Sequence, residues 1–448
     1  MRRSILLFVI ISIAALVPIT SYDLFWHLAT GHWIADHRAL PASDPFAVAS
    51  DRVPWINGEW LFDVLVYPLQ RAIGFAGLTI LRALFVAALF AIPVWRQAAS
   101  PVVAAIAFAG ANPLLDVRPA SVAAACLVAA IAIARRSWIA FALLTVLWIN
   151  VHPSALLAPV IMLVMTRSIP KTFASFAALF VNPFGWRAIG APISLNALVN
   201  SGAFVNAEWQ RSSPLVFPLL YLTIIAAIAW FVMTKKGEVI LFVILALLAV
   251  MHVRHQPLYF AALPLLLPPI PWKKSADLIA IAAVIFAFLR VPHALGPAKH
   301  RWPAAAVARL KASGLRGHIY NPDQFGGFVI WSFYPERRAL TDGRNELYRT
   351  FNAEYARARV DSRAWHALLR KYEIDLAVEE YRRETMTVVD ALTKKQRQLP
   401  ASLVYWPRAQ WALIGYDEVG MVFARRAAFP PEVLQKWEIA GVVPDAIN

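Results

Sequence analysis

Long apolar segments separated by short polar connections fill the first two thirds of the chain. Eleven apolar runs are long enough, or nearly so, to be membrane helices: residues 4–20, 77–95, 101–115, 119–134, 138–150, 154–166, 172–183, 214–233, 238–252, 257–271 and 275–290. A helix needs about 20 apolar residues to cross a bilayer. The pattern predicts a membrane all-α domain over residues 1–294, with about 11 transmembrane helices and a large first outer loop, residues 21–76.

Basic residues are distributed unevenly over the connections between these runs. Eleven lie in the N-terminus and in alternate, very short connections: Arg2, Arg3, Arg96, Arg135, Arg136, Arg167, Lys171, Lys235, Lys236, Lys273 and Lys274. The other connections hold seven in much more sequence. Cytoplasmic loops are enriched in Lys and Arg. We therefore expect a cytoplasmic N-terminus, with the first loop and the C-terminal region on the outer side.

The remaining sequence predicts a linker over residues 295–305 and a soluble domain over residues 306–448. Strands are expected at 317–320, 328–333 and 374–378, and helices at 347–372 and 387–398. A closing hairpin is expected at 411–416 and 420–424. Alternation of strands and helices favours a small α/β domain with helices on the faces of a sheet.

Composition supports a membrane protein and narrows its partners. The chain is 59% hydrophobic and only 16% charged, against about 25% charged in soluble proteins. Its formal net charge of +16 suits anionic membrane lipids. No nucleic-acid partner is expected, because no binding motif or basic helix is present. The single cysteine, Cys126, excludes an intrachain disulfide and a thiolate-rich metal site.

Acidic residues concentrate in the first outer loop. Six of the ten acids in residues 1–290 lie there, and Asp23 comes directly after the first apolar run. A carboxylate at this position can accept a proton from a hydroxyl group, and His27 can donate to a phosphate. The alternative for Asp23 is a helix cap. A metal site made of Asp23, His27 and His32 has no established ligand spacing, so no metal is assigned and a divalent cation stays an open alternative.

Each later outer connection supplies an arginine, a histidine or both. Arg118, His152, Arg254 and His255 are the candidates, and the acids Asp44 and Glu59 of the first loop complete the predicted substrate-binding set. Cationic donors beside a carboxylate suit a phosphate or pyrophosphate on a lipid. We expect these groups to line one lipid-accessible pocket with Asp23. The alternative is that each loop only needs polar residues to meet water.

Several motifs resemble those of a large group of little-characterised bacterial membrane proteins. They are Asp23-x-x-Trp26-His27, Asp44-Pro45-Phe46, Glu59-Trp60, Arg118-Pro119, Trp148-x-Asn150-x-His152, Asn182-Pro183-x-Gly185, Glu208-Trp209, Gly326-Gly327 and Asp342-Gly343-Arg344. That group resembles the GT-C superfamily of polyprenyl-phosphate-sugar-dependent glycosyltransferases. The resemblance implies a GT-C-like helix bundle. It also implies that Asp23 occupies the position of the catalytic acid in those enzymes.

The implied function is transfer of a sugar from a polyprenyl-phosphate donor to a glycan, lipid or protein acceptor. The implied location is the bacterial cytoplasmic membrane, with the reaction at its outer face. Asp23 would orient or deprotonate the acceptor hydroxyl. Two alternatives stay open: a transporter or flippase of lipid-linked glycan, and a non-catalytic envelope assembly protein.

Overall fold

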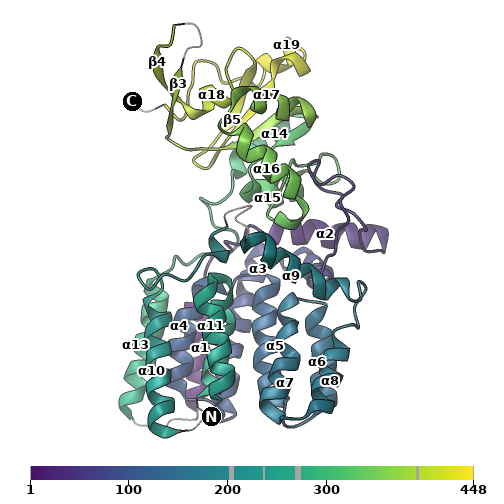
Figure 1. The fold of residues 1–448 in the computed structure, drawn as a ribbon. Helices are drawn as coiled ribbons and strands as arrows, with labels where there is room; N and C mark the ends of the chain where they lie inside the picture. The colour runs from purple at the N-terminus through teal and green to yellow at the C-terminus, as the bar shows by residue number, and fades with distance from the viewer. Residues whose placement is uncertain (1, 201–205, 236–237, 268–273, 390–392, 447–448) are drawn as a thin grey trace. The chain divides into compact units, whose positions relative to one another are not determined.

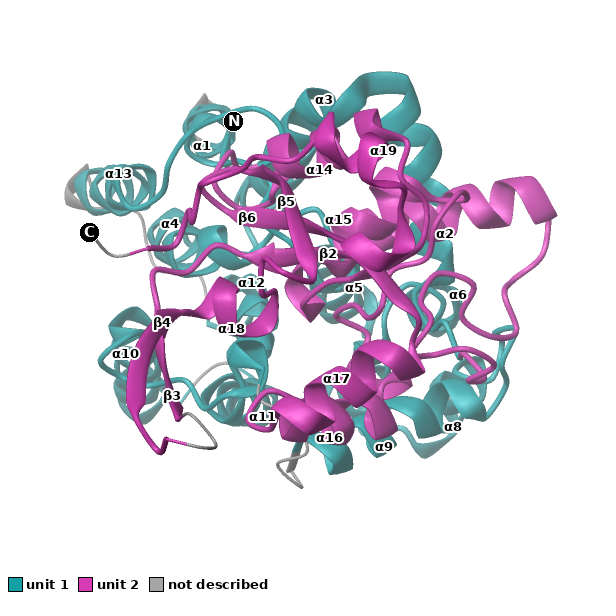
Figure 2. Ribbon diagram, turned by 90° about the horizontal axis from the view of Figure 1, so that it is seen from above, with its two compact units in different colours: residues 1–21, 56–297 teal, residues 22–55, 298–448 magenta. Residues whose placement is uncertain are grey.

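The chain forms two compact units in a computed structural model that describes residues 2–200, 206–235, 238–267, 274–389 and 393–446. Unit 1 comprises residues 1–21 and 56–297, and unit 2 comprises residues 22–55 and 298–448 (Figure 2). Most of the predicted first outer loop therefore belongs to the same unit as the C-terminal region. Lys236, Lys273 and parts of the predicted segments 257–271 and 387–398 lie outside the described residues.

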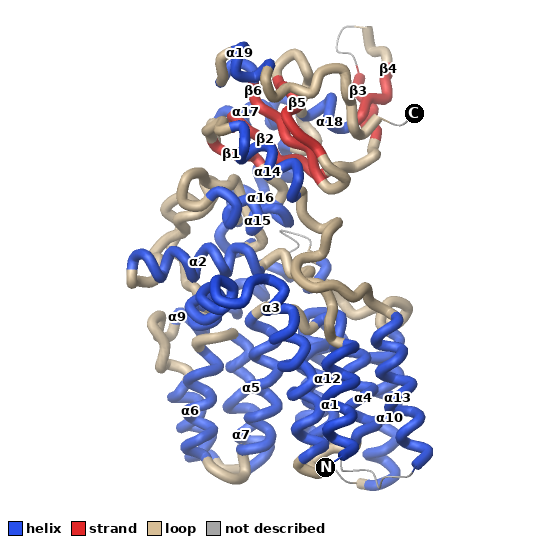
Figure 3. Tube along the Cα trace, turned by 180° about the vertical axis from the view of Figure 1, so that it is seen from behind, coloured by secondary structure: helices blue, strands red, loops and turns tan. Residues whose placement is uncertain are grey.

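Unit 1 is built from helices, most of which run side by side in alternating directions (Figures 1 and 3). The longer ones are α1 (Arg2–Ala14), α3 (Trp60–Trp95), α4 (Pro101–Ala111), α5 (Pro119–Ile133), α6 (Trp138–Ile149), α7 (Ala158–Thr166), α8 (Ile169–Ala178), α9 (Arg187–Asn200), α10 (Pro218–Thr234), α11 (Val239–Met251), α12 (Gln256–Leu266) and α13 (Lys274–Leu289). Single-turn helices are η1 (Asn112–Leu114), η2 (Pro153–Leu157), η3 (Ala207–Trp209) and η4 (Val253–His255).

The prediction of about 11 transmembrane helices in a GT-C-like bundle is wrong. A helix lies within each apolar run, but in the described residues only Trp60–Trp95 is long and apolar enough to cross a membrane. The other apolar helices have 10–17 residues, fewer than the ~20 that span a bilayer core. Most of the predicted runs are themselves shorter than this ~20-residue length, and the helices inside them are about equally short.

Prolines and left-handed residues explain why these helices are short. Pro101, Pro119 and Pro218 each occupy the first helical position, which suits a residue that lacks a backbone N–H. Arg167 and Lys235 follow α7 and α10 in the left-handed conformation, at φ 54° in both cases, which ends a helix. Pro101 and Pro119 are also the first residues of their apolar runs, and Arg167 directly follows another run, so run and helix have nearly the same bounds at these positions.

The long helix α3 is itself divided. Gly74 has φ 66° and ψ −177°, a conformation open to glycine and strained for other residues. Residues 60–73 therefore form one helical segment and residues 75–95 a second, more apolar one. The first segment carries Asp63, Gln70 and Arg71 among apolar residues, a composition that suits a helix lying at a membrane surface.

A buried arginine joins several helix ends of unit 1. The Arg82 guanidinium donates to the carbonyl oxygens of Ala15 and Val17, both at 3.1 Å, and of Asn112 at 3.1 Å, and also to that of Leu115. These carbonyls lie after α1 and around η1, where no helical partner is left for them. Arg82 thus supplies hydrogen bonds that the ends of these helices lack.

Unit 2 combines helices with a mixed sheet. Its strands are β1 (His318–Tyr320), β2 (Ile374–Glu380), β3 (Thr385–Val389), β4 (Gln396–Pro400), β5 (Trp411–Tyr416) and β6 (Gly420–Arg425). Its helices are α2 (Leu24–His37), α14 (Ala304–Ser313), α15 (Asp323–Phe333), η5 (Asn345–Leu347), α16 (Arg349–Ala358), α17 (Ser362–Lys371), α18 (Ala401–Tyr405), η6 (Arg426–Ala428) and α19 (Pro431–Gln435). The main sheet has the order β1-β2-β6-β5, with β1 parallel to β2 and the other pairs antiparallel, and β3-β4 form a separate hairpin.

Backbone hydrogen bonds attach residues 46–49 to the C-terminal region. The N–H of Val48 donates to the carbonyl of Ala339 at 2.9 Å, and the N–H of Ala339 donates to the carbonyl of Phe46 at 3.1 Å. Ala339 also bridges to Ile319 of β1. The N-terminal segment therefore extends the edge of the main sheet, which explains why residues 22–55 belong to unit 2.

Three predicted elements of the C-terminal region are wrong. The expected strand 328–333 is the second half of α15, and the expected single helix 347–372 is divided into α16 and α17. Asp361 begins α17 by accepting the backbone N–H of Arg363 at 2.7 Å. The described parts of segment 387–398 belong to β3 and β4 instead of a helix. Tertiary packing overrides the local preferences of such short segments.

Close backbone packing surrounds the two glycines of α15. A Cβ at Gly326 would lie 2.1 Å from the Thr341 carbonyl oxygen, and one at Gly327 would lie 2.8 Å from the Tyr22 carbonyl oxygen. Since α2 packs against α15, these glycines let two other parts of unit 2 approach the helix backbone.

Replacing Gly326 with alanine is expected to destabilise unit 2 by about 1–3 kcal/mol, the usual cost of overpacking a core. The new Cβ would meet backbone atoms of Thr341 and Asp342, which cannot rotate away. Amide hydrogen exchange in β2, β5 and β6 measures the effect. Gly58→Ala is the control, because nothing lies within 4 Å of its Cβ position. Unchanged protection in Gly326→Ala would contradict the prediction.

Candidate functional site

The eight residues of the predicted site are divided between the two units. Unit 2 contains Asp23, His27 and Asp44. Unit 1 contains the other five, which are Glu59, Arg118, His152, Arg254 and His255. Each unit therefore presents its own group of candidate residues.

Asp23 is the half-buried residue that directly precedes α2. Its side chain makes no capping hydrogen bond, and its Oδ1 accepts the indole N–H of Trp26 at 3.3 Å. The same oxygen lies 3.2 Å from the position that a Cβ would take on Gly343. A carboxylate at a helix N-terminus interacts favourably with the partial positive charge there. The backbone next to Gly343 and the indole of Trp26 thus position Asp23.

His27 lies one turn further along α2 and is buried. Its ring centroid is 3.6 Å from that of Trp26, with the rings tilted by 32°. Its backbone N–H donates to the Asp23 carbonyl at 3.1 Å. Packing against an indole in the interior suits a role in positioning Trp26 and α2.

Asp44 belongs to a buried ion network, which we call the Arg344 cluster. Its members are Asp44, Ser50, Asp342, Arg344 and Tyr348. Arg344 Nη1 lies 3.0 Å from Asp44 Oδ1, an ion pair whose angles fall outside those of a hydrogen bond. Arg344 Nε donates to Asp342 Oδ1 at 2.8 Å. The Tyr348 hydroxyl donates to Asp342 Oδ2 at 2.7 Å, and the Ser50 hydroxyl donates to Asp44.

Aromatic rings enclose the guanidinium of this cluster. Its central carbon lies 4.5 Å from the ring centroid of Trp55, 5.4 Å from Trp26 and 5.6 Å from Phe46. Arg344 is 3% exposed and Asp342 is fully buried. Burial lowers the pKa of Arg344, but the charges of Asp342 and Asp44 outweigh it and raise that pKa above its ordinary value. The arginine is therefore a permanent cation between two carboxylates.

The Arg344 cluster has the features of a structural element. Both its carboxylates already accept from groups within unit 2, and its members are buried. A buried charge is tolerated when it is paired and hydrogen-bonded. The motif Asp342-Gly343-Arg344 therefore holds the segment around Asp44 against the C-terminal region, and Asp44 is engaged by protein groups.

A second polar group of unit 2 lies near the start of α15. Arg301 places its guanidinium 4.0 Å from the ring centroid of Tyr22, and Gln324 donates to Glu380 at 2.8 Å. The Asp323 residue is exposed as a whole, but partial burial of its carboxyl group raises its pKa. The charges of Asp342 and Glu380 raise it further, against a backbone hydrogen bond from Gln324.

Alternate connections of unit 1, among them those that contain Asp116, Asn150, Glu208 and Arg254, lie at one end of its helices, which we call the polar end. Thr20 donates to Asp116 at 2.8 Å, and the Asn150 amide donates to the Val181 carbonyl at 2.9 Å. Segments far apart in the sequence are thus joined there by hydrogen bonds, and the five predicted residues of unit 1 lie in these connections.

Glu59 and His152 face each other at the polar end. His152 Nε2 lies 3.7 Å from Glu59 Oε1. The backbone N–H of Ser154 donates to His152 Nδ1 at 3.1 Å, so a neutral ring carries its proton on Nε2, which faces Glu59. Trp60 next to this pair donates to Asn150 Oδ1 at 2.9 Å. A carboxylate and an imidazole in this arrangement can exchange a proton or bind a hydroxyl group.

Arg118 forms a bidentate ion pair with Glu208, with 2.8 Å between Nη2 and Oε2. Sequence reasoning named both residues but did not pair them. Much of the charge of Arg118 is therefore balanced within unit 1. A phosphate group at Arg118 would share the guanidinium with Glu208 or displace that carboxylate.

His252, Arg254 and His255 form the turn before α12. His252 Nδ1 lies 2.7 Å from the Trp209 carbonyl oxygen, and the Arg254 guanidinium lies 4.3 Å from the Trp209 ring centroid. Burial, assisted by the charge of Arg254, lowers the pKa of His255 to about 4. His255 is therefore neutral at pH 7, and Arg254 is the cation of this turn.

Sequence reasoning missed several partners in these sites. Ser50, Tyr348 and Ser154 were not proposed, and none carries a local signal, because each is defined by a contact with a distant or turn-related residue. Trp209 belonged to a listed motif, but its contacts with His252 and Arg254 were not predicted. Arg82 did carry a local sequence signal, since it is a lone charge in an apolar run. A buried charge of this kind needs hydrogen-bonding partners in the folded protein.

Within the described residues, no group of three or more His, Cys, Asp and Glu side chains is arranged to hold a metal ion. His32 instead lies 3.3 Å from Asp36 on the next turn of α2.

In comparisons with known proteins, no protein-family model and no curated protein matches this chain.

Replacing Arg344 with methionine is expected to destabilise unit 2 by about 3–5 kcal/mol, the usual cost of removing one partner from a buried ion pair. Asp44 and Asp342 would remain buried without their cation. Chemical denaturation followed by tryptophan fluorescence measures the loss. Lys371→Met is the matched control, since Lys371 pairs with Glu354 on the surface, where a pair contributes at most about 1 kcal/mol. Equal losses in the two variants would refute the structural role.

Two buried tyrosines are expected to make unit 2 less stable in alkali. Burial raises the pKa values of Tyr348 and Tyr320 well above their ordinary value. The unfolded chain releases these protons near pH 10, whereas the folded protein retains them. Their contribution is therefore complete below pH 10, and the free energy of unfolding falls above it by about 1.4 kcal/mol per pH unit for each tyrosine.

Tyr348→Phe tests this pH dependence. Denaturant unfolding between pH 9 and 11.5 should show a shallower loss of stability in this variant than in the wild type, since one of the buried tyrosines with a raised pKa is gone. Tyr416→Phe is the control, because Tyr416 is exposed, and it should keep the wild-type slope. A Tyr348→Phe slope identical to that of the wild type would rule out this assignment.

Proposed function

We propose that this chain is a glycosyltransferase of the bacterial cytoplasmic membrane that moves a sugar from a polyprenyl-phosphate donor to a glycan, lipid or protein acceptor. The observation that carries the proposal is the surface of unit 1, where large apolar side chains point outward along several helices. The proposal requires that this surface contacts lipid, and it does not depend on how many helices cross the bilayer.

Exposed large apolar residues lie on many helices of unit 1, including α1, α3, α6, α10, α11 and α13. Examples are Leu143, Leu222, Ile225, Val232, Leu278 and Leu289. Val232 is 71% exposed and Leu289 is 76% exposed. Large contiguous apolar patches are rare on soluble monomers and mark contact with a membrane or a partner. Contact with lipid would give unit 1 access to a substrate carried on a polyprenyl chain.

The polar end of unit 1 has the chemistry to recognise the phosphate of such a donor. Arg118 and Arg254 are cations there, and His152 is a hydrogen-bond donor at Nε2. Guanidinium groups bind phosphate oxygens through paired, charge-assisted hydrogen bonds.

Asp23 of unit 2 is the group that we propose as the base for the acceptor hydroxyl. It is half-buried, it precedes a helix, and its position is set by the contact with Gly343. In the proposed reaction, the acceptor oxygen forms a bond to the anomeric carbon, and the bond from that carbon to the phosphate oxygen breaks. The phosphate leaves with the electron pair, Asp23 takes the acceptor proton, and the configuration is inverted. General-base help of this kind contributes about 10²–10⁴-fold.

A non-catalytic envelope assembly protein is the second candidate. The burial of His27 and Asp44 favours it, because both are held by contacts inside unit 2. In that case unit 2 would bind a partner, and Asp23 would only begin α2.

Asp23→Asn separates the two candidates. The variant keeps the shape of the side chain but cannot accept a proton, so we expect at least a 100-fold loss of sugar transfer at unchanged abundance in the membrane. Mass analysis of lipid-linked and surface glycans measures the loss in cells. Asp36→Asn on the same helix is the matched control, because Asp36 is exposed. Full activity of Asp23→Asn would remove Asp23 from the reaction, and unchanged glycans in a deletion strain would favour the assembly role.

A further inference from the structure

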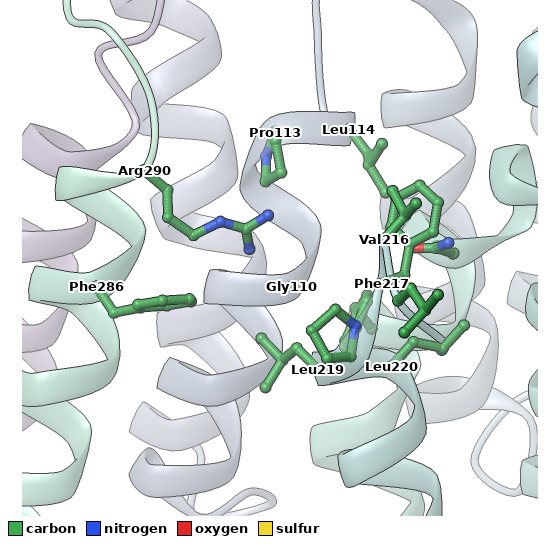
Figure 4. A pocket seen from close by; sticks show the side chains of 13 residues that line it. Gly110, Pro113, Leu114, Val216, Phe217, Leu219, Leu220, Phe286 and Arg290 are labelled. Carbon is green, nitrogen blue, oxygen red and sulfur yellow. The ribbon is translucent and has the colours of Figure 1, made fainter. Parts of the chain in front are cut away.

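Unit 1 contains a cavity of about 230 Å³ at its polar end. Its walls come from α4 through Gly110, from the start of α10 through Phe217, from α12 through Phe260, and from the end of α13 through Phe286 and Arg290 (Figure 4). Apart from Arg290 and the amide of Gln256, which donates to Ser212 at 2.8 Å, the lining is apolar. None of the residues proposed for sugar transfer lines it.

Arg290 follows the last residue of α13, and its side chain extends into the cavity from one wall (Figure 4). The guanidinium carbon lies 5.2 Å from the ring centroid of Phe286. Within the described residues no carboxylate forms an ion pair with it. The cavity thus combines apolar walls with one cation that no acid of the described chain neutralises.

We propose that this cavity binds an anionic phospholipid, with part of one acyl chain between the apolar walls and the phosphate at Arg290. The volume is below the ~300–1,000 Å³ of pockets that enclose a whole small molecule, so it suits a segment of a chain. Apolar walls do not satisfy the hydroxyl groups of a sugar. Arginine binds phosphate oxygens in a planar, bidentate geometry.

The neighbouring surface supports a membrane phospholipid as the occupant. Ile285 and Leu289 on α13 are 52% and 76% exposed, so apolar surface continues from the cavity along the helix. A second acyl chain would lie against it. The net charge of +16 also favours anionic over zwitterionic lipids. This site does not depend on the proposed sugar transfer.

Lipid binding to the full chain in detergent tests the proposal, with phosphatidylglycerol and phosphatidylcholine titrated separately and the bound lipid counted by native mass spectrometry. Arg290→Gln should weaken phosphatidylglycerol binding about tenfold, as expected for the loss of one charge-assisted pair, and leave phosphatidylcholine binding unchanged. Arg96→Gln is the matched control, because Arg96 is an exposed arginine after the last residue of α3, away from the cavity.

A second variant tests the cavity itself. Val216 lines the cavity and is 62% exposed, so Val216→Trp should fold, which a melting temperature near that of the wild type would verify, and should reduce binding of both lipids. Three results would overturn the proposal: equal effects of Arg290→Gln and Arg96→Gln, wild-type lipid binding by Val216→Trp, or displacement of phosphatidylglycerol by an equal amount of polyprenyl phosphate.

Discussion

One buried guanidinium is the constraint on which the architecture of unit 2 depends. Arg344 lies between Asp44, which comes from the N-terminal segment, and Asp342, which comes from the C-terminal region. Charges without solvent are stable only when paired and hydrogen-bonded. The chain therefore has to bring residues 22–55 against the C-terminal region to complete the cluster. That requirement, together with the backbone bonds to Ala339, sets the position of α2 and hence that of Asp23.

In unit 1, too, buried polar groups need hydrogen-bonding partners, but here the groups are backbone carbonyls at helix ends. Its helices are short, and their ends leave backbone carbonyls without helical hydrogen bonds. Arg82 satisfies four of these carbonyls, and Asp116 accepts from the backbone and side chain of Thr20. The polar end is therefore a bonded structure in its own right. Any role in binding phosphate would be added to side chains that already have structural partners, as Arg118 has in Glu208.

The candidate residues differ in whether they are buried among structural partners. Asp44 and His27 are buried among protein groups, and His255 is neutral at pH 7. Asp23, Arg118 and Arg254 are only partly buried, whereas His152 is buried. The cavity at Arg290 adds a feature that no motif indicated, because its walls come from four helices and its cation follows the last residue of α13.

The sequence by itself located most helices of unit 1, since apolar runs report local burial directly, but its runs covered neither α9 nor residues 60–73 of α3. It also identified Asp23 as a distinct acid after the first helix, and it separated a strand-containing C-terminal region from the apolar helices. Tertiary structure decided whether segments 328–333 and 387–398 form helix or strand, and which unit contains residues 22–55. It also decided that Asp44 meets Arg344. The physical reason is range: hydrophobic periodicity is set by neighbours along the chain, whereas ion pairs, sheet edges and glycine contacts join residues that only the folded chain brings together.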